Sequence, residues 1–210
     1  MFAFFSKKGN IALNIGNKRV GRLIFRRIKG RPLDSFESIV GTIFENDGYW
    51  VKTCFKVNLS KEEKRKIGRP SSPRWELDIV AFKGRSKEIL VIECKSYLDS
   101  HGVKVEGLKG GKDKEKYKLF NDENLRKVVF NRLMKQLVYS GACPKNTTLK
   151  LCLAAGKVAS KEDREALSVY FNKKGWVFYS DEWIKTKLIE LAKSGYEDEV
   201  AIVTTKLLTR

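Results

Sequence analysis

Apolar residues recur at helical spacing in several segments of the chain. Between residues 34 and 47 they return every three or four positions, which predicts a helix with Asp34 as its N-cap and Gly48 beyond its end. The same spacing predicts helices at 121–139 and 161–173, and near 181–194 and 197–208.

Short apolar runs between these helices predict five strands. The strands span residues 49–57, 76–82, 88–95, 149–155 and 176–179. Two polar segments, 61–74 and 99–120, are predicted as loops because they are rich in charge, glycine and proline or lysine. No internal repeat accompanies these elements, and 210 residues suffice for one domain with added segments.

The composition indicates a globular chain with strong positive charge. Hydrophobic residues make up 42% and charged residues 32%, which excludes a disordered chain. No apolar run approaches the ~20 residues of a membrane helix, and charge follows the apolar start, so we expect no signal peptide. Lys and Arg number 43 against 25 Asp and Glu, giving a net charge of +18. This charge predicts a polyanionic partner, nucleic acid first and membrane surface second.

The cysteines and the single histidine argue against a zinc site. No C-x-x-C pair is present, and His101 is the one histidine of the chain. Cys54, Cys94 and Cys152 lie in predicted strands, whereas Cys143 does not. We expect these three to be small core residues in a reducing cytosol, which predicts a cytoplasmic protein. His101 is expected at the surface.

Positive charge is concentrated at the start of the chain. Residues 1–32 hold nine Lys and Arg and no acid, which predicts a basic arm that includes a short hairpin. Its arginines would contact phosphates, the alternative being a solvated charged face. The candidates are Arg22, Arg26 and Arg27.

One predicted strand carries charge where burial is expected. Residues 89–92 are apolar on both faces, which is typical of a central strand, and alternation puts Glu93 and Lys95 on one face. A loop of two or four residues before this strand places Asp78 directly opposite Glu93, with Cβ atoms ~5 Å apart. Two carboxylates that close repel each other unless a divalent cation lies between them.

These positions predict a metal site. Asp78 and Glu93 would hold Mg²⁺ or Mn²⁺, and the backbone carbonyl of Cys94 would add an oxygen ligand. Lys95 would orient or help deprotonate the attacking water and offset charge on the phosphate. The alternative is a buried structural ion pair between Glu93 and Lys95.

Glu37 is a fourth catalytic candidate. It flanks the apolar stripe of the first predicted helix, from which it could reach the same site. The alternative is a capping box, because Asp34 and Glu37 are three residues apart.

With these residues in this order, the sequence resembles the PD-(D/E)XK nuclease superfamily, which has the restriction-endonuclease-like fold. The matching parts are Phe36-Glu37, Gly48-Tyr49, Glu76-Leu77-Asp78-Ile79-Val80 and Ile92-Glu93-Cys94-Lys95. The helix acid is similar to that of Holliday-junction resolvases and some restriction-type nucleases. The resemblance covers roughly residues 33–180 and implies an α/β core, with a mixed central sheet flanked by helices, that hydrolyses phosphodiester bonds with a metal.

Two positions depart from the pattern. Leu77 replaces the proline before the first acid, and Gln136-Leu137-Val138-Tyr139 is one residue shorter than the Gln-and-Tyr motif of exonuclease-like branches. The sequence therefore does not support an exonuclease assignment.

The expected organisation has three parts: a basic arm at 1–32, a nuclease core at 33–180 and a C-terminal helical segment at 181–210. The arm, the 61–74 loop and the 104–118 loop would hold the duplex, together with the polar face of the 121–139 helix, for which a solvated face is the alternative. Beyond the arm, the candidate nucleic-acid contacts are Lys64, Arg65, Lys66, Arg69, Arg74, Arg132, Lys135 and Gln136.

The leading hypothesis is a Mg²⁺-dependent DNA endonuclease of restriction, junction-resolving or repair type. Mn²⁺ is expected to substitute for Mg²⁺, and a homodimer would allow both strands to be cut. The alternatives are a DNA-binding module on a nuclease fold without hydrolysis and an RNA-directed nuclease, because phosphate attraction does not distinguish the sugars.

Overall fold

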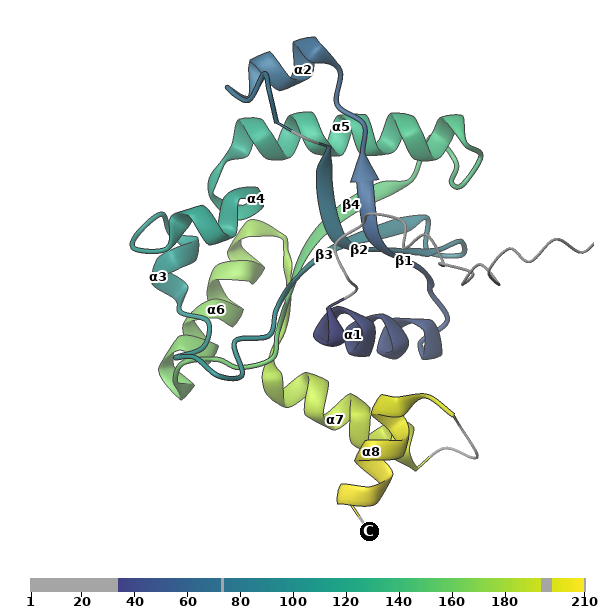
Figure 1. The fold of residues 1–210 in the computed structure, drawn as a ribbon, viewed down its shortest axis with the longest axis vertical. Helices are drawn as coiled ribbons and strands as arrows, with labels where there is room; N and C mark the ends of the chain where they lie inside the picture. The colour runs from purple at the N-terminus through teal and green to yellow at the C-terminus, as the bar shows by residue number, and fades with distance from the viewer. Residues whose placement is uncertain (1–33, 73, 194–197, 210) are drawn as a thin grey trace, which may run out of the picture. The chain divides into compact units, whose positions relative to one another are not determined.

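The computed structural model describes residues 34–72, 74–193 and 198–209, all within one unit that begins at residue 32. The expected basic arm at 1–32, with Arg22, Arg26 and Arg27, lies outside the described residues. The elements are α1 (Ser35–Asn46), β1 (Trp50–Val57), α2 (Lys61–Lys66), β2 (Trp75–Lys83), β3 (Glu88–Lys95), α3 (Val105–Leu108), the 3₁₀ helix η1 (Lys114–Tyr117), α4 (Lys118–Asn121), α5 (Glu123–Tyr139), β4 (Thr148–Ala155), α6 (Lys161–Lys174), β5 (Val177–Tyr179), α7 (Asp181–Ala192) and α8 (Val200–Leu208) (Figure 1).

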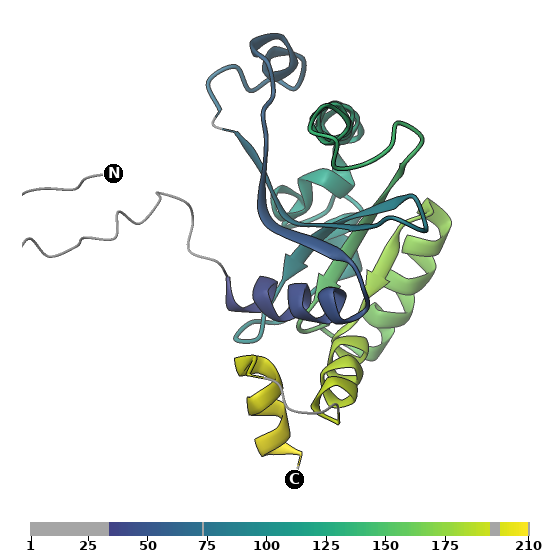
Figure 2. The ribbon, with the colours of Figure 1, turned by 90° about the vertical axis from the view of Figure 1, so that its right-hand side faces the viewer.

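The strands form one mixed sheet in the order β1-β2-β3-β4-β5. The β1–β2 and β2–β3 pairs are antiparallel, and the β3–β4 and β4–β5 pairs are parallel. Helices α5 and α6 cover one face through residues such as Leu133 and Phe171, whereas α1 and α7 cover the other through Phe44 and Ile184 (Figures 1 and 2). The expected α/β architecture, with a mixed sheet flanked by helices, is confirmed.

Helix α1 begins and ends where the sequence predicts. The Asp34 carboxylate accepts a hydrogen bond from the backbone N–H of Phe36 at 2.8 Å, which satisfies a free donor of the first turn. Gly48 follows the helix at φ +83°, a conformation that glycine adopts without steric cost. The helix is therefore held at both ends, and its buried stripe presses against the sheet.

The loop between β2 and β3 sets the register that the sequence predicts. Four residues, 84–87, join the strands, and the pairing runs from Lys83 with Glu88 to Ile79 with Ile92. Because side chains alternate along a strand, this register decides which residues meet beyond Ile79 and Ile92.

The sequence predicts a loop over residues 61–74, but only part of this segment is a loop. Residues 61–66 form α2, because Ser60 and Glu63 make a reciprocal capping box. Three basic residues in its last turn also complement the helix dipole.

The prediction of a loop at 99–120 is wrong. Two short helices and a 3₁₀ helix, α3, η1 and α4, lie in this segment. It is anchored by apolar side chains that a mobile loop would leave in water. The buried ones are Val103, Leu108, Tyr117, Leu119 and Phe120.

The cysteines and histidine agree largely with the sequence analysis. All four thiols are free. Cys94 and Cys152 are buried as expected, Cys143 is buried as well, and Cys54 is only half-buried. His101 is exposed, which confirms its prediction. Across the described ranges, no helix has both the length and the apolar character to cross a membrane.

A close approach at Gly156 holds the ends of β3 and β4 together. The backbone N–H of Gly156 donates to the Lys95 carbonyl at 2.9 Å. A Cβ atom at this position would lie 2.6 Å from the Ser96 carbonyl oxygen and 3.0 Å from the ring of Phe36. Only glycine fits here without displacing the chain that follows Lys95.

Substituting Gly156 with alanine should therefore destabilise the protein. We expect the free energy of unfolding of Gly156→Ala to fall by about 1–3 kcal/mol, because the added methyl group meets backbone atoms that cannot rotate away. Gly84→Ala is the matched control, since its Cβ would meet nothing closer than 3.9 Å. Urea unfolding of both variants measures the difference, and equal stability of the two would contradict this account.

Candidate active site

The sheet forks at the two predicted acids. Ile79 and Ile92 form the last pair between β2 and β3, and beyond them β2 stays beside β1 while β3 stays beside β4. In the register of that pairing, Asp78 and Glu93 are the next residues on the two strands. They therefore occupy the point where the strands part. Figure 2 shows β1 and β2 continuing from the sheet toward α2.

The Asp78 side chain takes over a main-chain hydrogen bond at the fork. Its Oδ2 atom accepts the backbone N–H of Cys94 at 2.8 Å. A carboxylate thus replaces the carbonyl that a continued ladder would supply, and the Cys94 main chain is held beside Asp78.

Glu93 and Lys95 share one face of β3, as predicted. The Lys95 Nζ atom lies 3.8 Å from Glu93 Oε2, and the two side chains are 19% and 15% exposed. Val91, two residues earlier, is in the core under α5, whereas Ile92 and Cys94 belong to the core under α1. An ammonium group therefore lies next to one of the two acids, in a partly enclosed position.

The environment of Glu93 favours its protonated form. Burial raises the pKa of Glu93 to about 7, and the nearby Asp78 and Glu37 carboxylates add to the rise, while Lys95 opposes it. The Cys94 thiol is shifted in the same direction, because burial and the same acids raise its pKa. The site thus brings the Asp78, Glu93 and Glu37 carboxyl groups near one ammonium group, that of Lys95.

Glu37 approaches the fork from α1. Its side chain is only 3% exposed, and its Oε2 atom accepts a hydrogen bond from the Cys54 thiol at 3.7 Å. Asp34 caps the helix through its bond to Phe36. The charge of Glu37 acts on both Glu93 and Cys94, so it lies in the same electrostatic neighbourhood.

Cys54 is the one residue of this neighbourhood that sequence analysis assigned to the core alone. It has φ +49°, and the pairing of β1 with β2 skips Cys54 and Asp78 while it includes the residues on either side. An irregular backbone at this point carries no sequence signal, because cysteine is common in regular strands.

The donor set of the fork suits a hard divalent cation. Two carboxylates and a main-chain carbonyl are oxygen ligands, and Mg²⁺ binds through one or two carboxylates while keeping several waters. Within residues 34–72, 74–193 and 198–209, no three His, Cys, Asp or Glu side chains are grouped so as to hold a metal. Two carboxylates with a main-chain carbonyl are the kind of donor set that an open Mg²⁺ site uses, in which water fills the remaining positions.

Two of the candidate nucleic-acid contacts, Arg132 and Gln136, join α5 to other elements. Arg132 forms an ion pair with Glu63 at 2.7 Å, which joins α5 to α2. Although burial acts in the opposite direction, the hydrogen bond from Arg132 holds the pKa of Glu63 below its ordinary value. Gln136 accepts the Asn58 N–H at 2.6 Å and donates to the Lys56 carbonyl at 3.3 Å, which joins α5 to β1.

The remaining basic candidates differ in whether their side chains contact other residues or are exposed to solvent. The Lys64 ammonium group donates to the Ser72 carbonyl at 2.6 Å, and the Arg69 guanidinium lies over the Trp75 ring, 5.3 Å from its centroid. The exposed candidates are Arg65, Lys66, Arg74 and Lys135.

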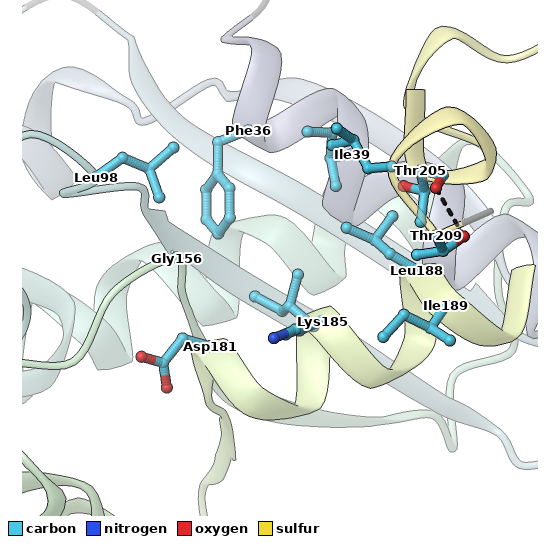
Figure 3. A pocket seen from close by; sticks show the side chains of 12 residues that line it. Phe36, Ile39, Leu98, Gly156, Asp181, Lys185, Leu188, Ile189, Thr205 and Thr209 are labelled. Carbon is cyan, nitrogen blue, oxygen red and sulfur yellow. Dashed lines mark hydrogen bonds between the residues drawn. The ribbon is translucent and has the colours of Figure 1, made fainter. Parts of the chain in front are cut away.

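A separate cavity lies between α1, α7 and α8 (Figure 3). Its volume is about 420 Å³, and apolar side chains such as Phe36, Ile39 and Leu188 form most of its walls. Its one acid, Asp181, is paired with Arg164 at 3.0 Å. Because the fork residues do not line it, this cavity is a gap in helix packing and not the candidate active site.

The raised pKa of Glu93 predicts a pH-dependent stability. A carboxyl group whose folded pKa of about 7 exceeds its ordinary 4.5 stabilises the fold below pH 4.5, and this stability is lost as the pH rises through 7. Glu93→Gln removes this titration. In EDTA at pH 8, we expect its free energy of unfolding to exceed that of the wild type by about 1–3 kcal/mol, and the gap to close toward pH 5.

Glu165→Gln, on the exposed face of α6, is the control and should change stability equally at both pH values. Urea unfolding at pH 5 and pH 8 measures the two differences. A gap between Glu93→Gln and wild type that does not depend on pH would contradict the strained carboxylate.

We compared the chain with protein-family models, curated proteins and solved structures, and no match was found in any of the three comparisons.

Proposed function

We propose that the protein is a Mg²⁺-dependent DNA endonuclease with a restriction-endonuclease-like core. The observation that carries this proposal is the convergence of Asp78 and Glu93 at the fork, with Lys95 at 3.8 Å from Glu93. A partly buried pair of acids with like charge destabilises a fold, and the binding of a cation is the function that best accounts for the pair.

The connectivity of the sheet supports the same proposal. An antiparallel hairpin, β2–β3, supplies the two acids, and the parallel strand β4 holds β3 in place beyond the fork. The resemblance to PD-(D/E)XK nucleases concerns this hairpin and the helix α1 that precedes it. Glu37 lies on α1, where the resolvase-like acid of that pattern is expected.

The residues at the fork divide the chemistry between them. Asp78 and Glu93 would hold the cation, with the Cys94 carbonyl as a further oxygen donor. When bound, the cation would lower the pKa of a water molecule and stabilise charge that develops on the phosphate. Water would attack phosphorus in line with the leaving oxygen and lose a proton to solvent, and the P–O bond to the leaving oxygen would break as that oxygen takes a proton from solvent.

Lys95 would act beside the attacked phosphate. Its ammonium group, 19% exposed, can donate hydrogen bonds to the incoming water and to a phosphate oxygen. Glu37, buried behind the acids, would add a third negative charge to this neighbourhood and thereby favour cation binding.

The net charge supports nucleic acid as the substrate. At +18, the chain attracts phosphates strongly, and the exposed contacts Arg65, Lys66, Arg74 and Lys135 add to this attraction. Charge attracts phosphates and does not read bases, so the proposal covers nucleases of restriction, junction-resolving and repair type alike.

Cleavage of supercoiled plasmid tests the proposal. With Mg²⁺ or Mn²⁺ the wild type should nick or linearise the plasmid, and with EDTA it should not. Asp78→Ala, Glu93→Ala and Lys95→Ala should each lower the cleavage rate by roughly a hundredfold or more, because each removes a cation ligand or a donor to the reacting phosphate.

Glu165→Ala is the control, because Glu165 is exposed on α6 and belongs to none of the strands at the fork. Anisotropy of a labelled duplex in EDTA reports binding separately. A wild type that binds this duplex but leaves the plasmid intact with either metal would contradict the enzyme and favour a DNA-binding module.

A further inference from the structure

A groove of about 940 Å³ lies between the β1–β2 edge of the sheet and the C-terminal end of α5. Its floor contains Val80, Phe82 and Ile89 from β2 and β3. Trp50, the first residue of β1, and Tyr139, the last residue of α5, lie at its rim. The volume is within the range of sites that hold small organic groups.

The two aromatic rings at the rim are almost fully in solvent. Trp50 is 83% exposed and Tyr139 is 95% exposed. Across the described part of the chain, they are the only aromatic residues among the large exposed hydrophobic ones. Neither belongs to the ring contacts made by the other aromatic residues, such as the cluster around Phe171. Two such rings at one groove indicate a binding surface.

The charge around the groove is positive. Lys52 lines it, and the exposed Arg85 and Lys87 belong to the same turn as Gly84, which also lines it. No Asp or Glu is among the lining residues. The nearest acid in sequence, Glu88, is paired with Lys150 at 3.2 Å.

We propose that this groove binds the unpaired bases of a single-stranded nucleic acid segment. The inference rests on the proposed function in one respect, which is that the protein acts on nucleic acid. Exposed aromatic rings stack on bases of any sequence, and the basic rim attracts the phosphates between them. An apolar floor suits base faces, which a duplex keeps hidden in its stack.

The groove lies on the strands that carry the candidate active site. Val80 is two residues from Asp78 on β2, and Ile89 is four residues from Glu93 on β3, so the separations along the strands are roughly 7 and 13 Å. Ile89 and Val91 face the same core as Val80, and Glu93 continues that face. A strand held in the groove would therefore pass within a few nucleotides of the fork.

This placement narrows the substrate class. A nuclease with a base-binding groove next to its acids would favour DNA with unpaired bases, such as a flap or a junction, over an intact duplex.

Strand binding in EDTA tests the inference without any hydrolysis. Fluorescence anisotropy of a labelled oligothymidylate of about 15 nucleotides, at about 0.15 M salt, gives the dissociation constant. An abasic strand of equal length is the second probe, because it has the phosphates but no bases. Thermal unfolding of each variant verifies that it is folded.

We expect Trp50→Ala and Tyr139→Ala each to weaken oligothymidylate binding about tenfold and to leave abasic-strand binding unchanged. Trp50→Phe and Tyr139→Phe, which keep a ring, should stay within about threefold of wild type. Val169→Ala, which removes a 70% exposed side chain from α6, is the matched control and should bind like wild type.

Three results would overturn the inference. The first is unchanged oligothymidylate binding in both alanine variants, and the second is an equal loss for the abasic strand. The third is a self-associated wild type, seen in sedimentation velocity, that Trp50→Ala dissociates without a change in strand affinity. In that case the groove would be an interface between two copies. Plasmid cleavage that persists after any of these results would leave the proposed function standing.

Discussion

Repulsion between the Asp78 and Glu93 carboxylates is the interaction on which the arrangement of the candidate site depends. If the β2–β3 ladder continued past Ile79 and Ile92, the two side chains would lie ~5 Å apart on a covered face. The strands part instead, and the Asp78 side chain replaces a backbone acceptor for the Cys94 N–H. The fork relieves part of the repulsion, yet burial still raises the pKa of Glu93 to about 7. The residual strain is what cation binding would relieve.

The hairpin at this site could be predicted from the sequence because its determinants are local. A loop of four residues between two apolar strands fixes which residues face each other, and side-chain alternation then places Glu93 and Lys95 together. Helix α1 was predictable for a similar reason, since Asp34 supplies its cap and its apolar stripe is regular. The two loop predictions were wrong because the polar composition of these segments outweighed a helix cap in one and buried aromatic residues in the other. The Ser60–Glu63 capping box makes α2 a helix, and Tyr117 and Phe120 anchor a lysine-rich segment in the core.

The roles of the basic side chains could not be predicted, because they depend on partners far away in the chain. Arg132 has the sequence context of a solvated or phosphate-binding residue, yet it pairs with Glu63 on α2. Gln136 likewise bonds to the backbone of β1 and of Asn58. Charge along a sequence reports attraction to polyanions, but only packing decides which charges remain available. The structure shows which basic side chains are exposed, and Arg65 and Lys135 are among them.

These internal contacts bear on how nucleic acid would be selected. Phosphate attraction acts on any strand and weakens with salt, so a net charge of +18 provides affinity without choice. Selection among nucleic acids needs side chains that contact bases, and these side chains must lie at a defined distance from Asp78 and Glu93. Gln136 lines the groove and also fastens α5 to β1, while Arg132 fastens the same helix to α2. Tyr139 is one turn further along α5 and is carried by it. Gln136 and Arg132, which looked like phosphate contacts in the sequence, therefore attach the helix that carries Tyr139 to its neighbours.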